Sequence, residues 1–281
     1  MRKLALITGA TDGIGKATLW RFAREGWAVV AVGRDVGKLA NVARELREQV
    51  PGAEVETLQA DLGIMEEVVA VCDRFLASHQ TLDLLFLNAN TITQERTISS
   101  EGFEANLAVG HLGRALMAWK LESILAATPG SQILCTVGLN LERLDFEDLT
   151  MGKNFRAMVA LGRWQWANQV FSRVWNRSSK VPMNIFMPGL VKTKILSTEP
   201  GFQRVLILLV MTFVAISTRK AAEQVFSTVS QATEQLSRDH YYATGQDKGT
   251  RPLAMEIGDE DRVWSVTKDQ LSRFLVSRSG T

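Results

Sequence analysis

The 281-residue sequence predicts an α/β fold in which helices cover both faces of one doubly wound parallel sheet. Three observations support this prediction. Short apolar runs rich in strand-forming residues alternate with segments of helical length. These runs are apolar throughout instead of alternating with polar residues, as expected for strands that are covered on both faces. A glycine-rich segment joins the first apolar run to the first helical pattern, as in a βα unit.

The predicted strands follow one another at spacings that leave room for a helix between each pair. They are LALIT, AVVAV, EVETLQ, LDLLFL, QILCTV and VPMNIFM, at residues 4–8, 28–32, 54–59, 82–87, 132–137 and 181–187. The first predicted helix begins at Gly13 and runs to about Gly26, and another carries the apolar stretch at 157–171. Because the sequence has no internal repeat, low-complexity tract or linker, we expect a single Rossmann-type domain over residues 1–281.

The composition excludes several classes of function. The chain has 32 Lys and Arg against 30 Asp and Glu, a net charge of +2, and both signs are scattered, so no nucleic-acid surface is expected. Cys72 and Cys135 lie in apolar runs without metal-ligand spacing, which predicts reduced cysteines, a cytoplasmic protein and no metal site. The 12-residue apolar run at 205–216 is shorter than the about 20 residues of a membrane-spanning helix. The sequence does not exclude contact with a membrane surface or the formation of a homodimer.

Residues 196–217 interrupt the alternation of strands and helices. They follow the last predicted strand and are apolar where a surface helix would be more polar. In open α/β sheets ligands bind outside the carboxyl ends of the strands, so we expect this insertion to be a lid over an apolar substrate. A core helix is an equally weighted alternative. The side chains assigned to the substrate pocket are Trp164, Leu196, Leu206, Leu208, Leu209 and Phe213.

The segment TGATDGIG, residues 8–15, carries Gly9, Gly13 and Gly15 between the first strand and the first helix. Glycines allow a pyrophosphate to approach the backbone closely, and the helix N-terminus offers unpaired N–H groups to it. A tight turn also favours glycine, but the position directly after the first strand favours a dinucleotide site. At the end of the second strand, Arg34 favours the 2′-phosphate of NADP(H) over NAD(H). Asp35 is the competing candidate for a ribose contact, and it is equally suited to capping the next helix.

These motifs together resemble the short-chain dehydrogenase/reductase family, in particular its retinol-dehydrogenase-like branch. The matching segments are TGATDGIG, ADL at 60–62, LNAN at 87–90 and MPGLVKT at 187–193, in the order and at the places that the family has them. The resemblance implies NADP(H) binding by Gly9, Thr11, Asp12, Gly13, Ile14, Gly15, Arg34, Asp61, Leu62, Asn88, Ala89, Asn90, Pro188, Gly189, Val191 and Thr193.

The family reduces carbonyls with a Tyr, a Lys four residues later, a Ser and an Asn, and this sequence lacks at least three of these four groups. Aligned on ANQVF at 167–171, Leu161 stands at the Tyr position and Gln165 at the Lys position. Gly110 stands at the Asn position, and either Gly138 or Thr136 at the Ser position. A positioned acid is worth about 10²- to 10⁴-fold in rate, so ordinary carbonyl reduction is expected to be slow or absent.

Few side chains could replace the missing groups. His111 adjoins the Asn position and could act as an acid or base, although a structural role is the favoured interpretation. Thr136 and Gln165 could hydrogen-bond a substrate carbonyl. Arg114 and Arg163 are expected to be solvated, with a smaller chance of binding an anionic substrate.

Three hypotheses about function follow. The leading one is an atypical enzyme that holds a small hydrophobic substrate for cyclisation or isomerisation, a step that needs placement more than a strong acid. The second is an NADP(H)-dependent oxidoreductase acting on a substrate, such as an iminium ion, that needs no proton donor. The third is a non-catalytic protein that keeps the fold and the nucleotide. Asn90 adds a side chain near the nicotinamide, so the cofactor could be structural or absent.

Overall fold

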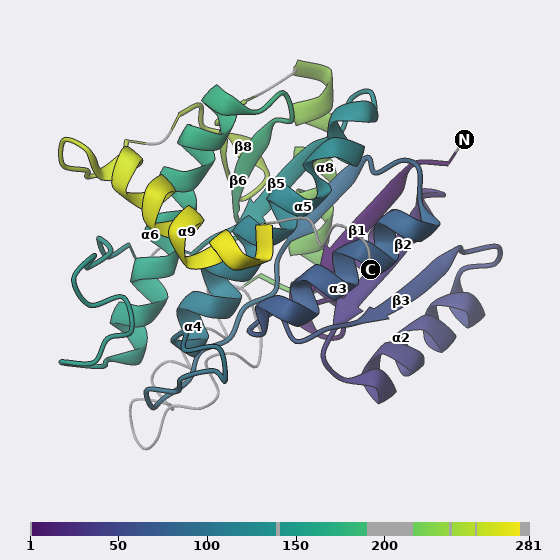
Figure 1. Cartoon of the computed structure of the whole chain (residues 1–281). Coiled ribbons are helices and arrows are strands. Elements are labelled where there is room, and N and C mark those ends of the chain that lie inside the picture. Colours follow the sequence, from purple (N-terminus) through teal and green to yellow (C-terminus); the bar gives the residue numbers. More distant parts are fainter. Residues whose placement is uncertain (1, 139–140, 190–215, 236–237, 251, 276–281) are drawn as a thin grey trace.

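The computed structural model describes residues 2–138, 141–189, 216–235, 238–250 and 252–275 (Figure 1). Val191, Thr193 and residues 196–215 of the predicted lid, including Leu196, Leu206, Leu208, Leu209 and Phe213, lie outside these residues. The described residues form one α/β structure with a central sheet, as the sequence predicts.

The sheet has the strand order β3-β2-β1-β4-β5-β6-β7-β8. Its strands are β1 Leu4–Thr8, β2 Ala28–Gly33, β3 Val55–Gln59, β4 Leu84–Leu87, β5 Gln132–Thr136, β6 Met183–Met187, β7 Tyr241–Ala243 and β8 Gln246–Asp247. Every neighbouring pair is parallel except β7 and β8, which form an antiparallel hairpin. The first six are the predicted strands. Strands β7 and β8 were not among the predicted strands, because they are too short to give a clear apolar run.

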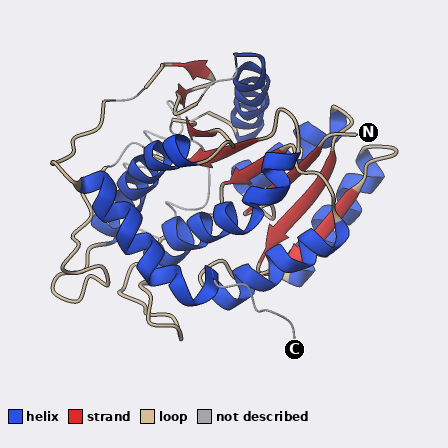
Figure 2. Ribbon diagram, turned by 45° about the horizontal axis from the view of Figure 1, so that its top comes forward, coloured by secondary structure: helices blue, strands red, loops and turns tan. Residues whose placement is uncertain are grey.

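Helices cover both faces of the sheet (Figure 2). On one face lie α1 Gly13–Arg24, α2 Val36–Gln49 and α8 Thr218–Gln235, whose buried side chains pack in one apolar cluster. On the other lie α3 Met65–Ser78, α5 Gly113–Ala127, α6 Ala157–Ser178 and α9 Asp259–Leu275, with a larger cluster. The short α4 Ala105–Leu107 continues through a π-helical turn, η1 Ala108–Leu112, into α5. The two clusters explain why the strands are apolar on both faces.

The strand order reverses at β1, which has β2 on one side and β4 on the other. In such sheets a crevice opens outside the carboxyl ends of the strands at this reversal, and ligands bind there. The candidate site therefore lies at this crevice. It is bordered by the ends of β1, β4 and β5 and by the starts of α1 and α5.

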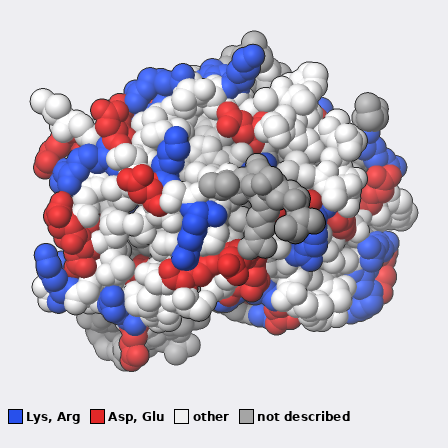
Figure 3. Space-filling model, in the orientation of Figure 1, with Lys and Arg blue, Asp and Glu red and all other residues white. Residues whose placement is uncertain are grey.

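The remaining expectations concern surface and environment. Positive and negative side chains are interspersed on the face seen in Figure 3. Among the described residues, no helix is long and apolar enough to cross a membrane, and no group of three or more His, Cys, Asp or Glu could hold a metal. Cys72 and Cys135 are both free and buried.

Candidate cofactor and active site

The glycine-rich loop is held against the end of β4. Gly9 and Gly13 have φ angles of 66° and 57°, in the left-handed region that favours glycine. A Cβ at Gly15 would lie 2.3 Å from the carbonyl oxygen of Gly9 and 2.8 Å from Nδ2 of Asn88. Asn88 Nδ2 in turn donates to the carbonyl of Thr8 at 3.1 Å. Packing against Gly9 and Asn88 therefore requires glycine at position 15. The absence of side chains at the glycines also leaves the backbone of the loop open to a ligand.

The N-terminus of α1 follows this loop at the carboxyl end of β1. Asp12 caps the helix, because its Oδ1 accepts from the N–H of Gly13 at 2.8 Å. The first turn of α1 contains Ile14 and Gly15 and no acidic residue. Thr11 approaches β2 closely, since a Cβ at Gly33 would lie 2.9 Å from its Cγ2. The first-turn amides and the helix dipole form the type of site that binds a phosphate.

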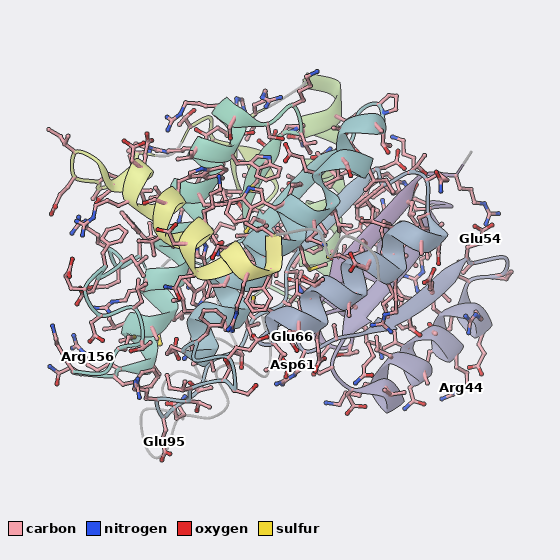
Figure 4. The ribbon with its side chains drawn as sticks, viewed as in Figure 1. Arg44, Glu54, Asp61, Glu66, Glu95 and Arg156 are labelled. Atoms are coloured by element: carbon pink, nitrogen blue, oxygen red, sulfur yellow. The ribbon has the colours of Figure 1, made fainter. Side chains whose placement is uncertain are left out.

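Arg34 and Asp61 lie beyond the ends of β2 and β3. The Arg34 side chain is 68% exposed, and its Nη1 is 3.6 Å from Oδ2 of Asp61. Figure 4 shows Asp61 beside Glu66, in the first turn of α3. Asp35 accepts from the N–H of Lys38 at 2.9 Å and caps α2, which is the alternative role given to it above. Arg34 is therefore an exposed cation at this edge that can meet a phosphate, although it also pairs with Asp61.

The segment after β4 is fixed by Thr8. The hydroxyl of Thr8 accepts from the N–H of Asn88 at 2.8 Å and of Ala89 at 2.9 Å. The side-chain oxygen of Asn90 is buried and has no partner among the described residues. Leu62, after β3, is 5% exposed and packs in the core, so only its backbone can contact a ligand. After β6, Gly189 has a φ of 79°, directly behind Pro188.

Trp164 occupies the space next to Gly110. A Cβ at Gly110 would lie 2.6 Å from two ring carbons of Trp164, which is 2% exposed. The indole therefore stands where an Asn side chain at position 110 would extend. This burial does not support the prediction that Trp164 lines the substrate pocket. The nearby Trp166 packs close to Phe146, and its Nε1 donates to the carbonyl of Ala254 at 3.0 Å.

Gln165 occupies the space next to Gly138 in the same way. A Cβ at Gly138 would lie 2.7 Å from Oε1 of Gln165, and this oxygen is buried without a partner among the described residues. Along β5, Cys135 belongs to the apolar cluster that contains α6, and Leu134 belongs to the opposite one. Because side chains alternate along a strand, Thr136 points away from α6. Gly138, not Thr136, thus faces the residue at the predicted Lys position.

Leu161 and His111 complete this region. Leu161 is 9% exposed and offers only methyl groups. His111 is 1% exposed; its Nδ1 lies 3.0 Å from Oδ1 of Asn168 and its Nε2 lies 2.8 Å from Oγ1 of Thr267. Burial lowers the pKa of His111 to about 4, and the nearby charge of Arg114 acts in the same direction. With both ring nitrogens engaged between α6 and α9, His111 has a structural role and is not placed to exchange protons.

The expectation that Arg114 is solvated is wrong. Arg114 is 2% exposed, and its guanidinium donates to the carbonyls of Thr136 at 2.6 Å and Ala89 at 2.7 Å. The Trp164 ring lies over it, with 4.8 Å between Cζ and the ring centroid. The signal in the sequence is that Arg114 is followed directly by the apolar residues ALMAW within α5. Arg163 is partly buried, 3.6 Å from Asp145.

Comparison with known proteins identifies the family. The short-chain dehydrogenase family model matches residues 3–136. A protein of Streptomyces sp. (strain C5), provisionally named daunorubicin C-13 ketoreductase, is 33% identical over 196 residues, covering 69% of this chain and 67% of that protein. Bovine retinol dehydrogenase 12 is 28% identical over 275 residues, covering 96% and 86%. The chain belongs to the short-chain dehydrogenase family.

Solved structures show the same fold. The alcohol dehydrogenase of the archaeon Thermococcus sibiricus, complexed with 5-hydroxy-NADP, has a TM-score of 0.67 at 22% identity, covering 90% of this chain and all of that one. A short-chain dehydrogenase from Sphingobium yanoikuyae in complex with NADPH has a TM-score of 0.64 at 19% identity, covering 99% and 98%. The α/β Rossmann-type fold predicted from the sequence is thereby confirmed.

The residues present fit a nicotinamide dinucleotide. A backbone cradle that a Cβ at Gly15 would fill lies at the N-terminus of α1, and the exposed guanidinium of Arg34 lies to one side of it. The partnerless oxygen of Asn90 lies on the other side, after β4. These groups lie at the ends of three adjacent strands, β2, β1 and β4, which suits an extended ligand with phosphates in the middle.

Proposed function

We propose that this protein binds NADP(H) and transfers a hydride to a small hydrophobic substrate without taking a proton from a protein side chain. The observation that carries the proposal is that two spaces in the candidate site are already filled. Trp164 occupies the space beside Gly110, and Gln165 the space beside Gly138. The nucleotide cradle is intact, so the loss concerns proton transfer and not the fold.

The chemistry is limited by what these side chains can do. A bound NADPH would supply the hydride. Leu161 has no proton to give, so a reduced carbonyl takes its proton from water, which leaves hydroxide behind. Reduction of an iminium ion would need no proton, but the cation of Arg114 disfavours a second positive charge and favours a forming alkoxide. The protein is proposed to act in the cytoplasm.

A reaction without hydride transfer is the second candidate, because the side chain of Leu161 presents apolar surface and has no proton to give. Such a surface holds a substrate in one conformation, which can contribute several kcal/mol to a cyclisation or isomerisation. The family relatives and their names favour the hydride-transferring alternative, which we therefore place first.

Deuterium transfer from NADPH labelled at C4, with each stereoisomer tested in turn, separates the two candidates. Apolar aldehydes, ketones and enones should give deuterated products, at rates about 10²- to 10⁴-fold below those of enzymes with an acid in place. Leu161→Tyr combined with Gln165→Lys should raise the rate, whereas Leu161→Ala should not. Product without deuterium would support the second candidate. Failure to bind NADPH would refute the proposal and favour a non-catalytic protein.

A further inference from the structure

Arg114 places a positive charge at the carboxyl ends of β4 and β5. Its Nη2 donates to the carbonyl of Ala89, just after β4, and its Nη1 to the carbonyl of Thr136, the last residue of β5. Its Nε is buried without a partner in the described part of the chain. The guanidinium group of an arginine carries a positive charge in proteins.

This charge is not neutralised by any described carboxylate. Every ion pair among the described residues joins other groups, and the contacts of Arg114 are carbonyls, the thiol of Cys135 and the face of Trp164. A charge in a buried, low-dielectric setting acts over longer distances than one in water. This charge acts on its neighbours. Burial is the main cause that lowers the pKa of His111 and raises the pKa of the Cys135 thiol; Arg114 adds to the first effect and partly offsets the second.

The strand order determines which half of a bound dinucleotide meets this charge. Arg34 and Asp61 follow β2 and β3, and the phosphate-binding N-terminus of α1 follows β1. With the adenosine phosphate at Arg34 and the pyrophosphate at α1, the chain of the ligand continues across β4 towards β5. The nicotinamide half therefore lies at the end of the sheet where Arg114 is buried.

We propose that Arg114 makes the protein select the reduced cofactor NADPH over the oxidised cofactor NADP⁺. The inference rests on the proposed function, because it requires that this site binds NADP(H). The two forms carry the same phosphates and differ by one positive charge on the nicotinamide ring. A buried cation repels the charged ring of NADP⁺ and leaves the neutral ring of NADPH unaffected. Release of NADP⁺ is therefore favoured after each hydride transfer.

Titration calorimetry with NADPH and with NADP⁺ tests this selectivity directly. The wild type should bind NADPH on the order of tenfold more tightly than NADP⁺, and Arg114→Met should reduce the ratio of the two dissociation constants by about the same factor. Arg114→Lys, which keeps the charge, should retain the preference. Arg34→Met is the matched control: it removes an exposed cation from the phosphate end, so it should weaken both ligands equally and leave the ratio unchanged.

A structural role for Arg114 would weaken both ligands together, so an unchanged ratio in a folded Arg114→Met variant overturns the inference. Equal binding of the two forms by the wild type does so as well. If Arg114→Met does not fold, the wild type is titrated with 1,4,5,6-tetrahydro-NADP, whose ring is neutral. It should bind like NADPH, and binding like NADP⁺ overturns the inference. Absence of binding by all three ligands would instead refute the proposed function.

Discussion

Trp164 and Gln165 each occupy the place of a side chain that a neighbouring residue lacks. The pairs are Gly110 with Trp164 and Gly138 with Gln165, with would-be Cβ contacts of 2.6 Å and 2.7 Å. The sequence shows which residues stand at these positions. It does not show that they fit each other, because the fit depends on how α6 packs against η1 and the end of β5. Substituting either glycine alone should therefore be harmful, because the space beside it is already filled.

Gly110→Ala should destabilise the protein by about 1–3 kcal/mol, because the added methyl group overlaps the buried ring of Trp164. Urea unfolding measures the loss. In a Gly110→Ala/Trp164→Leu double variant the two costs should not add, because the smaller side chain makes room. Gly152→Ala is the control, since a Cβ there meets its nearest atom at an ordinary 3.5 Å. Equal effects at positions 110 and 152 would contradict the overlap.

His111 should make the fold less stable at mildly acidic pH. Burial lowers its folded pKa to about 4, below the unfolded value near 6.5, so the unfolded chain binds the proton more strongly. The stabilisation is present above pH 6.5 and is lost as the pH falls from about 6.5 to about 4. The loss at pH 5 is on the order of 2 kcal/mol.

Unfolding in urea at pH 7.5 and pH 5 measures this dependence. His111→Gln keeps polar atoms between Asn168 and Thr267 but cannot take up a proton in this range. The variant should therefore lose less stability than the wild type on acidification. Parallel pH curves for the two proteins would show that other groups are responsible.

At the scale of elements, α9 packs across α5 and α6 through contacts between residues that are far apart in the sequence. Trp264 of α9 stacks on Phe171 of α6, with ring centroids 5.2 Å apart, and meets Trp119 of α5 edge-on at the same distance. At its start, Asp259 is 1% exposed and accepts from Nη2 of Arg143 at 2.6 Å. The apolar residues of α9 predict a helix, but nothing in its own sequence specifies which two helices it covers.

Arg143→Met should destabilise the protein by about 2 kcal/mol, because it leaves the Asp259 carboxylate buried without its partner. This is less than for a wholly buried pair, since Arg143 is 34% exposed. Arg143 lowers the pKa of Asp259, so the pair stabilises the fold above the unfolded pKa and the loss is full at neutral pH. Arg177→Met is the control, because it removes a more exposed pair with Glu260 on the same helix. Thermal unfolding compares them, and equal losses would argue against the role of burial.

At the scale of the whole molecule, the repeating βα pattern made most of the architecture predictable. Six strands and the first helix lie within two residues of their predicted bounds, since long apolar runs and the glycine turn are local signals. The burial of Arg114 was not predictable in the same way. It depends on carbonyls of Ala89 and Thr136, which reach α5 only when β4 and β5 lie side by side.

Binding of NADPH should stabilise the whole fold. At a concentration 100 times its dissociation constant a ligand adds about 2.7 kcal/mol to the free energy of unfolding, so the melting temperature should rise. Arg34→Ala should weaken NADPH binding about tenfold or more through loss of a charged phosphate contact, but leave NADH binding unchanged. Arg44→Ala, which removes an exposed α2 arginine paired with Glu48, is the control (Figure 4). Equal weakening of NADPH and NADH by Arg34→Ala would place the phosphate elsewhere.

The position of α9 also matters while the chain is being synthesised. The aromatic face of α5 and α6, with Trp119 and Phe171, is complete once Ser178 has left the ribosome, but its cover begins only at Asp259. At a translation rate of about 5–20 residues per second, the nascent chain carries this face bare for roughly 4 to 16 s. During that interval the emerging protein exposes an apolar surface that can associate with other newly made polypeptides, until α9 emerges and covers it.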